Sequence, residues 1–335
     1  MPFKSLNSMP TKRVYLKAVE CNGFIYGIGG SDAKGQPINS MESFNQSNSK
    51  WKGHGCMSVN RAAPGCMVVG ESIVVMGGIS DGQEVTDSVE VFDTKTKEWS
   101  GRDGMKEALS GIACVVHDDR IFVVGGSAKD TNPRDYLMQY DLQNKTWKSL
   151  KDMPTARYAA TAFILRDNLY VIGGRQGKLA TNAFEVFDMN VGTWRKLPNL
   201  PSKNVFNQIV HTDTHVYALG GLDKDQKIKD TLEIFDLKTE KWTQGPSMKN
   251  KRADFVAAML NEKLWVAGGV SEVDKIKKPT DSVEIFDPTN NTWTDHPSVP
   301  SPFCSASYCT SKDNKLYVAG GMTLDGVTNN FFVLS

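Results

Sequence analysis

Short apolar segments recur along this chain and alternate with polar, turn-forming segments. Seven apolar segments have five residues each, and each ends directly before a Gly-Gly pair: FIYGI (24–28), SIVVM (72–76), RIFVV (120–124), NLYVI (168–172), HVYAL (215–219), KLWVA (263–267) and KLYVA (315–319). This length and the richness in β-branched and aromatic residues are typical of β-strands, and the Gly, Asn and Asp residues between the segments are typical of turns. The pattern predicts an all-β fold with little or no helix.

A second strand-like segment follows each of the first six Gly-Gly pairs, and a tryptophan stands six residues beyond its last Asp or Asn. The segments are MESFN (41–45), VEVFD (89–93), LMQYD (137–141), FEVFD (184–188), LEIFD (232–236) and VEIFD (283–287). The tryptophans are Trp51, Trp99, Trp147, Trp194, Trp242 and Trp293. With a further strand after each Met-Pro-x-x-Arg segment and one at each tryptophan, every unit is predicted to form four antiparallel strands.

The Gly-Gly pairs define a repeat. They stand at 29–30, 77–78, 125–126, 173–174, 220–221, 268–269 and 320–321, at intervals of 47 to 52 residues. Such a period indicates one supersecondary unit per repeat, which must bury its faces against its neighbours. Radial stacking of four-stranded sheets achieves this burial in a β-propeller. We therefore expect residues 1–335 to form one domain, a seven-bladed propeller.

The two ends of the chain share the last unit. The chain has seven Gly-Gly pairs but six tryptophan strands, and it ends at NNFFVLS (329–335), within the third strand of the last unit. Its start, FKSLNSMPTKR (3–13), repeats the internal segment WKSLKDMPTAR (147–157), with Phe3 in place of the tryptophan. We expect the N-terminal strand to complete the last blade, so that no sheet edge is left open.

The order of the Gly-Gly, Glu-x-Phe/Tyr-Asp, Trp and Met-Pro-x-x-Arg motifs resembles the kelch repeat over essentially the whole chain. Two stretches, GGRQGKL (173–179) and KRADFV (251–256), further resemble the kelch domain-containing protein 8 subfamily, which has a propeller and no BTB domain. The resemblance implies a protein-interaction module. The BTB and BACK domains through which many kelch relatives join ubiquitin ligases are not recognisable here, so recruitment to such a ligase in cis is not expected.

Residues that recur in phase are predicted to hold the blades together. The tryptophans and Phe3 should pack between strands as aromatic anchors. An arginine and a glutamate each recur at a fixed position of the repeat, which suggests a buried or half-buried Arg–Glu pair inside or between blades. The basic set is Arg13, Arg61, Arg157 and Arg252, and the acidic set is Glu42, Glu90, Glu185, Glu233 and Glu284.

Partner-binding residues should be those that break the repeat, because a single ligand lacks sevenfold symmetry. In kelch propellers the residue after Gly-Gly and the one or two after the arginine position line one mouth of the channel. At these positions most side chains here are small or apolar, and the exceptions are Tyr15, Tyr158, Arg175, Phe206 and Asp254. Aromatic side chains and an arginine are suited to docking a peptide or protein segment. With one off-template arginine, a strongly acidic ligand is not expected.

Charge and composition narrow the classes of partner. The chain has 39 basic and 38 acidic residues and a formal charge of +1, which favours neither nucleic acid nor a membrane as partner. We expect a monomer. The sequence contains no apolar run long enough for a membrane span or a signal peptide, and its six cysteines form no short-spaced pattern. These features predict a cytoplasmic protein with reduced thiols.

An enzyme is the alternative interpretation, since some kelch propellers act on a sugar or small molecule at the channel mouth. A copper oxidase would need histidines there, and none falls on the mouth positions. Asp254 with Arg175 or Arg252 is the acid–base combination that the sequence offers. His211 and His215 bracket one turn but lack a third ligand, which makes a poor metal site. We predict a non-enzymatic module with no catalytic residue, metal or cofactor.

Overall fold

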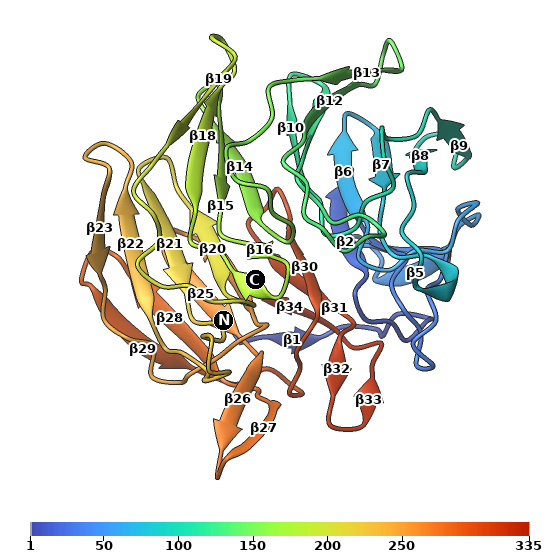
Figure 1. Cartoon of the computed structure of the whole chain (residues 1–335). Helices are drawn as coiled ribbons and strands as arrows, with labels where there is room; N and C mark the ends of the chain where they lie inside the picture. The colour runs from blue at the N-terminus through green and yellow to red at the C-terminus, as the bar shows by residue number, and fades with distance from the viewer. Residues whose placement is uncertain (1, 335) are drawn as a thin grey trace. The chain divides into compact units, whose positions relative to one another are not determined.

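The computed structural model describes residues 2–334 and has seven four-stranded antiparallel sheets, the blades of a seven-bladed β-propeller (Figure 1). The predicted all-β class is confirmed. Among the described residues the only helical segment is a 3-10 turn, Asp81–Gln83. No helix in this part of the chain has the length and apolar character needed to cross a membrane.

The chain divides into two compact units. Unit 1 comprises Met1–Ile25, Phe44–Trp51 and Leu200–Ser335, and unit 2 comprises Tyr26–Ser43 and Lys52–Asn199. Blades are numbered here by the order of their Gly-Gly pairs. Blades 2, 3 and 4 lie in unit 2, blades 5, 6 and 7 lie in unit 1, and the strands of blade 1 contribute residues to both.

The strands of the first four blades have the following bounds. Blade 1 contains β2 (Lys17–Cys21), β3 (Phe24–Ile28), β4 (Met41–Asn45) and β5 (Lys50–Gly53). Blade 2 contains β6 (Gly65–Val69), β7 (Ser72–Met76), β8 (Val89–Asp93) and β9 (Trp99–Arg102). Blade 3 contains β10 (Ala113–His117), β11 (Arg120–Val124), β12 (Leu137–Asp141) and β13 (Thr146–Ser149). Blade 4 contains β14 (Thr161–Leu165), β15 (Asn168–Ile172), β18 (Phe184–Asp188) and β19 (Thr193–Lys196).

The strands of the last three blades follow the same order. Blade 5 contains β20 (Gln208–His211), β21 (His215–Leu219), β22 (Leu232–Asp236) and β23 (Lys241–Gln244). Blade 6 contains β24 (Val256–Leu260), β25 (Lys263–Ala267), β28 (Val283–Asp287) and β29 (Thr292–His296). Blade 7 contains β30 (Ser307–Thr310), β31 (Leu316–Ala319), β34 (Phe331–Leu334) and β1 (Lys4–Ser5).

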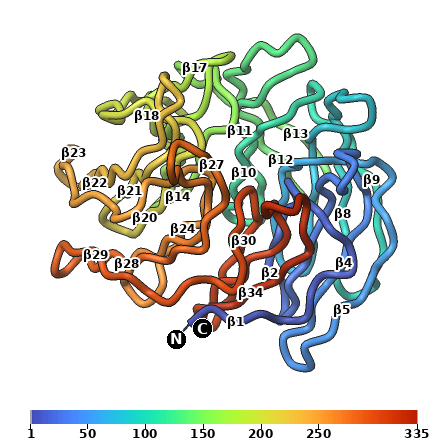
Figure 2. Tube along the Cα trace, turned by 90° about the horizontal axis from the view of Figure 1, so that it is seen from below, coloured from blue at the N-terminus to red at the C-terminus, as the bar shows by residue number. Residues whose placement is uncertain are grey.

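The N-terminal strand forms the outer strand of blade 7, as Figure 2 shows. Lys4 of β1 is paired with Val333 of β34, and the Leu6 amide donates to the Phe331 carbonyl at 2.9 Å. Phe3 is buried, packed in the core of blades 6 and 7. The predicted closure of the last blade agrees with this sheet.

In five blades the tryptophan of the outer strand joins neighbouring segments of its unit. Its ring packs on the Phe or Tyr opposite it, as for Trp147 on Tyr140, whose ring centroids are 4.8 Å apart. Its indole N–H donates to a backbone carbonyl some 44 residues earlier in the chain, as Trp147 does to Asp103 at 2.9 Å. The same bond is formed by Trp51, Trp99, Trp194 and Trp293. The tryptophans therefore hold successive repeats together through both packing and a hydrogen bond.

The Gly-Gly pair lets one blade approach the next. In blade 3, Gly125 and Gly126 have φ of 63° and 111°, which residues with a side chain rarely adopt. The Gly126 amide donates to the Arg157 carbonyl at 3.0 Å. A Cβ on Gly125 would lie 2.2 Å from the same carbonyl oxygen. Glycine is required here by both backbone conformation and space.

Three small hairpins between the second and third strands of blades 4, 6 and 7 were not predicted. They are β16 (Arg175–Gln176) with β17 (Leu179–Ala180), β26 (Val270–Val273) with β27 (Ile276–Pro279), and β32 (Met322–Thr323) with β33 (Gly326–Val327). The hairpin β26–β27 projects beyond the strands of blade 6 (Figure 1). Its two-residue turn has positive φ at Asp274 and Lys275, as a type I′ turn requires, without the Asn-Gly signal that marks such turns in a sequence.

Candidate functional site

Each blade is preceded by a turn in which one residue has a left-handed backbone. This residue stands two positions after the arginine position of the repeat. The set, with its φ angles, is Tyr15 (55°), Ala63 (46°), Gly111 (61°), Ala159 (50°), Phe206 (57°), Asp254 (55°) and Ser305 (51°). We call these the left-handed turn positions. Left-handed backbone costs a residue with a side chain about 1–2 kcal/mol.

In blades 2 to 7 the residue before the left-handed turn position pairs with the residue after Gly-Gly of the same blade. These antiparallel bridges join Ala62 to Ile79, Ser110 to Ser127, Tyr158 to Arg175, Val205 to Leu222, Ala253 to Val270 and Cys304 to Met322. The two sets of positions that the sequence analysis assigned to one mouth therefore meet, residue by residue, at one end of their blade.

Hydrogen bonds join two pairs of neighbouring turns through their left-handed residues. The Ala159 amide donates to the Gly111 carbonyl at 2.7 Å, and the Asp254 amide donates to the Phe206 carbonyl at 2.9 Å. The former pair joins blades 3 and 4, and the latter joins blades 5 and 6. The turns at Ala159 and Asp254 are thus held by a neighbouring turn.

Two of these turns carry bulky aromatic side chains. The Tyr15 and Phe206 side chains are 52% and 51% exposed, whereas blades 2, 3 and 4 place only Ala63, Gly111 and Ala159 there. Half-exposed rings gain little from burial, and a left-handed backbone disfavours them relative to glycine. Burial and backbone conformation therefore do not by themselves favour an aromatic residue at these two positions.

Asp254 is a half-buried carboxylate beside Phe206. Both the hydroxyl and the backbone N–H of Ser305 donate to its carboxylate. Burial raises the pKa of Asp254 despite these two hydrogen bonds. Burial, together with the nearby Asp254 charge, raises the pKa of Cys304 to about 11. The thiol is therefore protonated at neutral pH and is not a nucleophile.

The sequence analysis missed Ser305. From the arginine position to Gly-Gly there are 16 residues in the other six repeats and 17 in blade 7, where Phe303 replaces arginine. The extra residue lies in the turn between β30 and β31. An alignment of the repeats that allows a one-residue gap would have placed Ser305 in the set.

Tyr158 and Arg175 lie together in blade 4 of unit 2. Their backbones exchange hydrogen bonds of 3.1 and 2.8 Å, and both residues are half-buried. The Tyr158 hydroxyl donates to the Gly177 carbonyl at 2.8 Å, in the turn of the β16–β17 hairpin. A Cβ on Gly111 would lie 3.1 Å from the Tyr158 ring. Tyr158 therefore supports the hairpin that carries Arg175.

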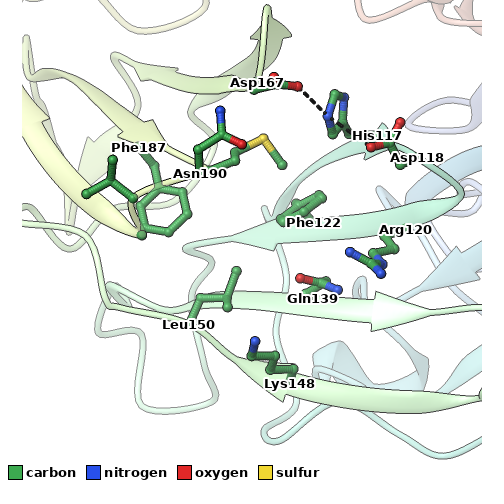
Figure 3. A pocket seen from close by; sticks show the side chains of 13 residues that line it. His117, Asp118, Arg120, Phe122, Gln139, Lys148, Leu150, Asp167, Phe187 and Asn190 are labelled. Carbon is green, nitrogen blue, oxygen red and sulfur yellow. Dashed lines mark ion pairs between the residues drawn. The ribbon is translucent and has the colours of Figure 1, made fainter.

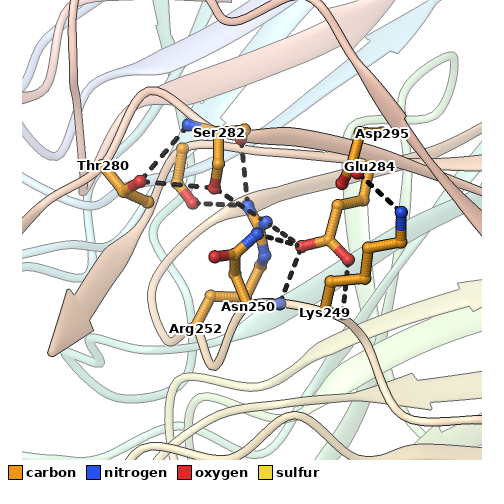
Figure 4. A network of polar contacts seen from close by, with 8 residues as sticks. Lys249, Asn250, Arg252, Thr280, Ser282, Glu284 and Asp295 are labelled. Atoms are coloured by element: carbon orange, nitrogen blue, oxygen red, sulfur yellow. Dashed lines mark hydrogen bonds and ion pairs between the residues drawn. The ribbon is translucent and has the colours of Figure 1, made fainter. Parts of the chain in front are cut away.

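Arg252 does not form an acid–base pair with Asp254. Figure 4 shows its guanidinium directed at Glu284, at 2.5 Å, and at Ser282. It also donates to the Gly268 carbonyl at 3.0 Å, and the whole residue is buried. Asp254 and Arg252, one of the two combinations of the enzyme interpretation, thus belong to two separate networks.

The same buried ion pair recurs in three blades. Arg61 bonds Glu90 at 2.7 Å, Arg157 bonds Glu185 at 2.6 Å, and Arg252 bonds Glu284. All three arginines have no exposed surface. Burial lowers the pKa of Arg157 to about 10, while Glu185 opposes this shift, so the guanidinium remains charged at neutral pH. Because these ion pairs are buried, they stabilise the blades and cannot contact a partner.

No candidate metal centre is found in residues 2–334, where no three His, Cys, Asp or Glu side chains gather closely enough to hold an ion. His211 lies in β20 and His215 in β21, on either side of the turn where the Thr212 amide donates to the His215 carbonyl at 2.9 Å.

Two family models match this chain. The Attractin/LZTR1 beta-propeller model matches residues 121–331, and the KLHDC2/KLHL20/DRC7 Kelch-repeats domain model matches residues 3–150. Kelch domain-containing protein 8B from Homo sapiens and that from Bos taurus are each 44% identical to this chain over 50 residues. This match covers 15% of the chain and 14% of each relative.

Proposed function

We propose, because this chain belongs to the kelch-repeat β-propeller family, that it is a non-enzymatic protein-interaction module that docks a peptide or protein segment. Kelch-repeat propellers commonly bind proteins, and the partner of this one would be held at the blade ends that carry the left-handed turns. No cofactor takes part in this function.

The pair of half-exposed aromatic rings in unit 1 carries the proposal. Phe206 and Tyr15 occupy left-handed turn positions that small residues fill in blades 2, 3 and 4. Stiff aromatic side chains supply a large contact area at a low entropy cost, which is why they are enriched among the residues that dominate binding. Beside Phe206, the Asp254 carboxylate can accept a hydrogen bond from a main-chain N–H or a basic side chain of the partner.

In unit 2, Arg175 with Tyr158 is a second proposed contact for a partner, considered separately from the residues of unit 1. A guanidinium can donate two parallel hydrogen bonds to a carboxylate or bind a main-chain carbonyl. The β16–β17 hairpin presents Arg175, and Leu179 of the same hairpin is 71% exposed. The proposed role of Tyr158 combines contact with the partner and support of this hairpin.

Affinity capture followed by titration of a recovered partner with purified variants tests the proposal. We expect Phe206→Gly and Asp254→Asn to weaken binding by about 1–3 kcal/mol each, and Arg175→Ala to do the same. Phe206→Gly should leave the melting temperature nearly unchanged, because relief of the left-handed backbone offsets the loss of a half-buried ring.

Val191→Gly is the matched control, since Val191 is 70% exposed but stands in the β18–β19 turn. It should bind the partner as the wild type does. If Phe206→Gly, Asp254→Asn and Arg175→Ala all retain wild-type affinity for every captured partner, the docking surface lies elsewhere and the proposal is wrong.

A further inference from the structure

A cleft of about 360 Å³ opens between blades 3 and 4 in unit 2 (Figure 3). Its apolar floor includes Phe122 and Leu150 of blade 3 and Phe187 of blade 4. Gln139 and Lys148 of blade 3 line the same space, and His117 and Asp167 lie at its upper end in the view of Figure 3. The volume lies in the range of small-molecule sites.

The corresponding space beside blade 1 is filled. There His54 stands at the repeat position of Leu150, three residues after the tryptophan. The His54 ring packs on Tyr26 and Phe92, with centroids 5.9 and 5.2 Å away, and its Nε2 lies 2.8 Å from the Ser43 hydroxyl. Tyr26, Ser43 and Phe92 are the repeat counterparts of Phe122, Gln139 and Phe187. In blade 3 a leucine, Leu150, stands where blade 1 has this histidine, and it lines the cleft.

Gln139 is polar where four other blades have an apolar residue. The residues at its position in blades 2, 4, 5 and 6 are Val91, Val186, Ile234 and Ile285. In the described chain its side-chain amide has no hydrogen-bond partner, although the residue is partly buried. A polar group placed on an apolar floor without a partner is costly for folding, so packing does not explain it.

Lys148 is directly opposite Gln139 in the strand ladder, and Phe122 is opposite Gln139 on its other side. The three side chains therefore share one face of blade 3. No described residue forms an ion pair or hydrogen bond with the Lys148 ammonium. The Gln139 amide and the Lys148 ammonium are two neighbouring donors on the face that also carries the Phe122 ring.

The two aspartates that line the cleft, Asp118 and Asp167, lie close to His117 rather than to Lys148. Asp167 and Asp118 lie 3.0 and 3.5 Å from Nε2 of His117, and Arg120 lies 3.9 Å from Asp141. Among the described residues lining the cleft, Lys148 is therefore a basic group without an ion-pair partner. A ligand that complements this arrangement has a flat apolar body and one anionic group.

We propose that this cleft binds a small aromatic carboxylate, as a site separate from the protein-docking surface. The ring of the ligand lies between Phe122, Leu150 and Phe187. Its carboxylate accepts hydrogen bonds from the Lys148 ammonium and the Gln139 amide, which are stronger than bonds between neutral groups. The cleft holds a one- or two-ring molecule and has no room for a folded peptide element.

Calorimetric titration of the full chain with three probes that share one ring system tests this inference. The probes are indole-3-acetate, the neutral indole-3-acetamide and the cationic tryptamine. We expect the acetate to bind at least about 10-fold more tightly than either of the others. Lys148→Met should weaken acetate binding about 10-fold and leave acetamide binding unchanged, since each factor of ten corresponds to about 1.4 kcal/mol.

Two further variants locate the site. Lys52→Met, at the same strand position in blade 1, should bind all three probes as the wild type does. Leu150→His, which restores the residue that fills the space in blade 1, should abolish binding of all three while the melting temperature stays near that of the wild type. Equal affinity for the three probes, no binding at millimolar concentration, or full binding by Leu150→His would each overturn the proposal.

Discussion

The Ser202 hydroxyl donates to the Glu233 carboxylate at 2.5 Å, where three other blades bring an arginine to the equivalent acid. In blade 5 the arginine position holds Asn204, whose side-chain amide donates to the Gly220 carbonyl at 2.9 Å instead. Glu233 is only 3% exposed, and burial raises its pKa. Blade 5 thus keeps the acid of the ion pair without its guanidinium.

This arrangement predicts that Glu233→Gln stabilises the protein at neutral pH. Because the pKa of the folded state is raised, the folded chain binds the proton more tightly than the unfolded chain. The resulting stability is present below the ordinary pKa of 4.5 and is lost as pH rises through the folded-state pKa. At pH 7 the Gln variant should gain about 1 kcal/mol in the free energy of unfolding.

Urea denaturation at pH 4, 5.5 and 7 measures this dependence. The gain of Glu233→Gln over wild type should shrink toward zero at pH 4, where Glu233 is mostly protonated in both states. Glu185→Gln is the control, and it should destabilise at pH 7, because Glu185 bonds Arg157. A Glu233→Gln protein that is less stable than wild type at pH 7 would refute the prediction.

Blades 3 and 7 replace both members of the ion pair with apolar residues. Leu109 and Met138 occupy the two positions in blade 3, where both belong to one buried cluster. Phe303 and Phe332 occupy them in blade 7, with ring centroids 6.2 Å apart. Buried ion pairs can often be exchanged for apolar residues of similar volume at little cost, whereas loss of one partner is expensive.

A double-mutant cycle in blade 4 tests this view. Arg157→Leu alone should cost about 3–5 kcal/mol, because it leaves the Glu185 charge buried without a partner. Arg157→Leu combined with Glu185→Met, the pair found in blade 3, should recover at least half of that loss. Chemical denaturation of the two single variants and the double variant supplies the comparison, and simple additivity of the two losses would contradict it.

Gly125→Ala should be far more damaging than Gly82→Ala. The two glycines have nearly the same φ, 63° and 66°, so the backbone penalty of about 1 kcal/mol applies to both. A Cβ at Gly125 would lie 2.2 Å from the Arg157 carbonyl oxygen, whereas nothing lies within 4 Å of one at Gly82. Thermal melting of both variants isolates the steric part, and equal losses would show that it is small.

Removal of the first ten residues should abolish most of the cooperative unfolding transition. Phe3 and Met9 are 5% and 1% exposed, and each buried apolar side chain contributes about 1.5–3 kcal/mol. Their loss, together with that of the partly buried Leu6, is comparable to the stability of a whole domain. The control is Lys4→Ala with Ser5→Ala, since both side chains are exposed. A truncated chain that melts within a few degrees of wild type would disprove closure by β1.

Much of the fold could be predicted because each repeat contains the sequence motifs that specify its strands and turns. The five-residue apolar segment before Gly-Gly, such as Ile121 to Val124 within β11, specifies a buried strand wherever it occurs. The copy of residues 147–157 at positions 3–13 revealed the closing strand, since equal sequence in equal phase implies an equal place in a blade. The hairpin β26–β27 escaped prediction because Asp274 and Lys275 adopt turn conformations that other residue types favour.

Comparison of the repeats predicted less about the candidate site. Phe206, Asp254, Tyr158 and Arg175 could be selected as departures from the repeat, and the structure shows that the first two are joined by a hydrogen bond, as are the last two. Their different surroundings could not be read from the chain. The Tyr158 hydroxyl is engaged by its own hairpin, whereas the Phe206 ring is half exposed.

The sequence alone determined the number of blades, the order of their strands and the residues that depart from the repeat, because these follow from local periodicity and from comparison of one repeat with another. The tertiary structure alone decided what each departure does. Leu150 opens a cleft because Phe187, from another blade, faces it across a space that no side chain fills. Such a volume depends on side chains that lie far apart in the sequence, so no pattern within one repeat records it.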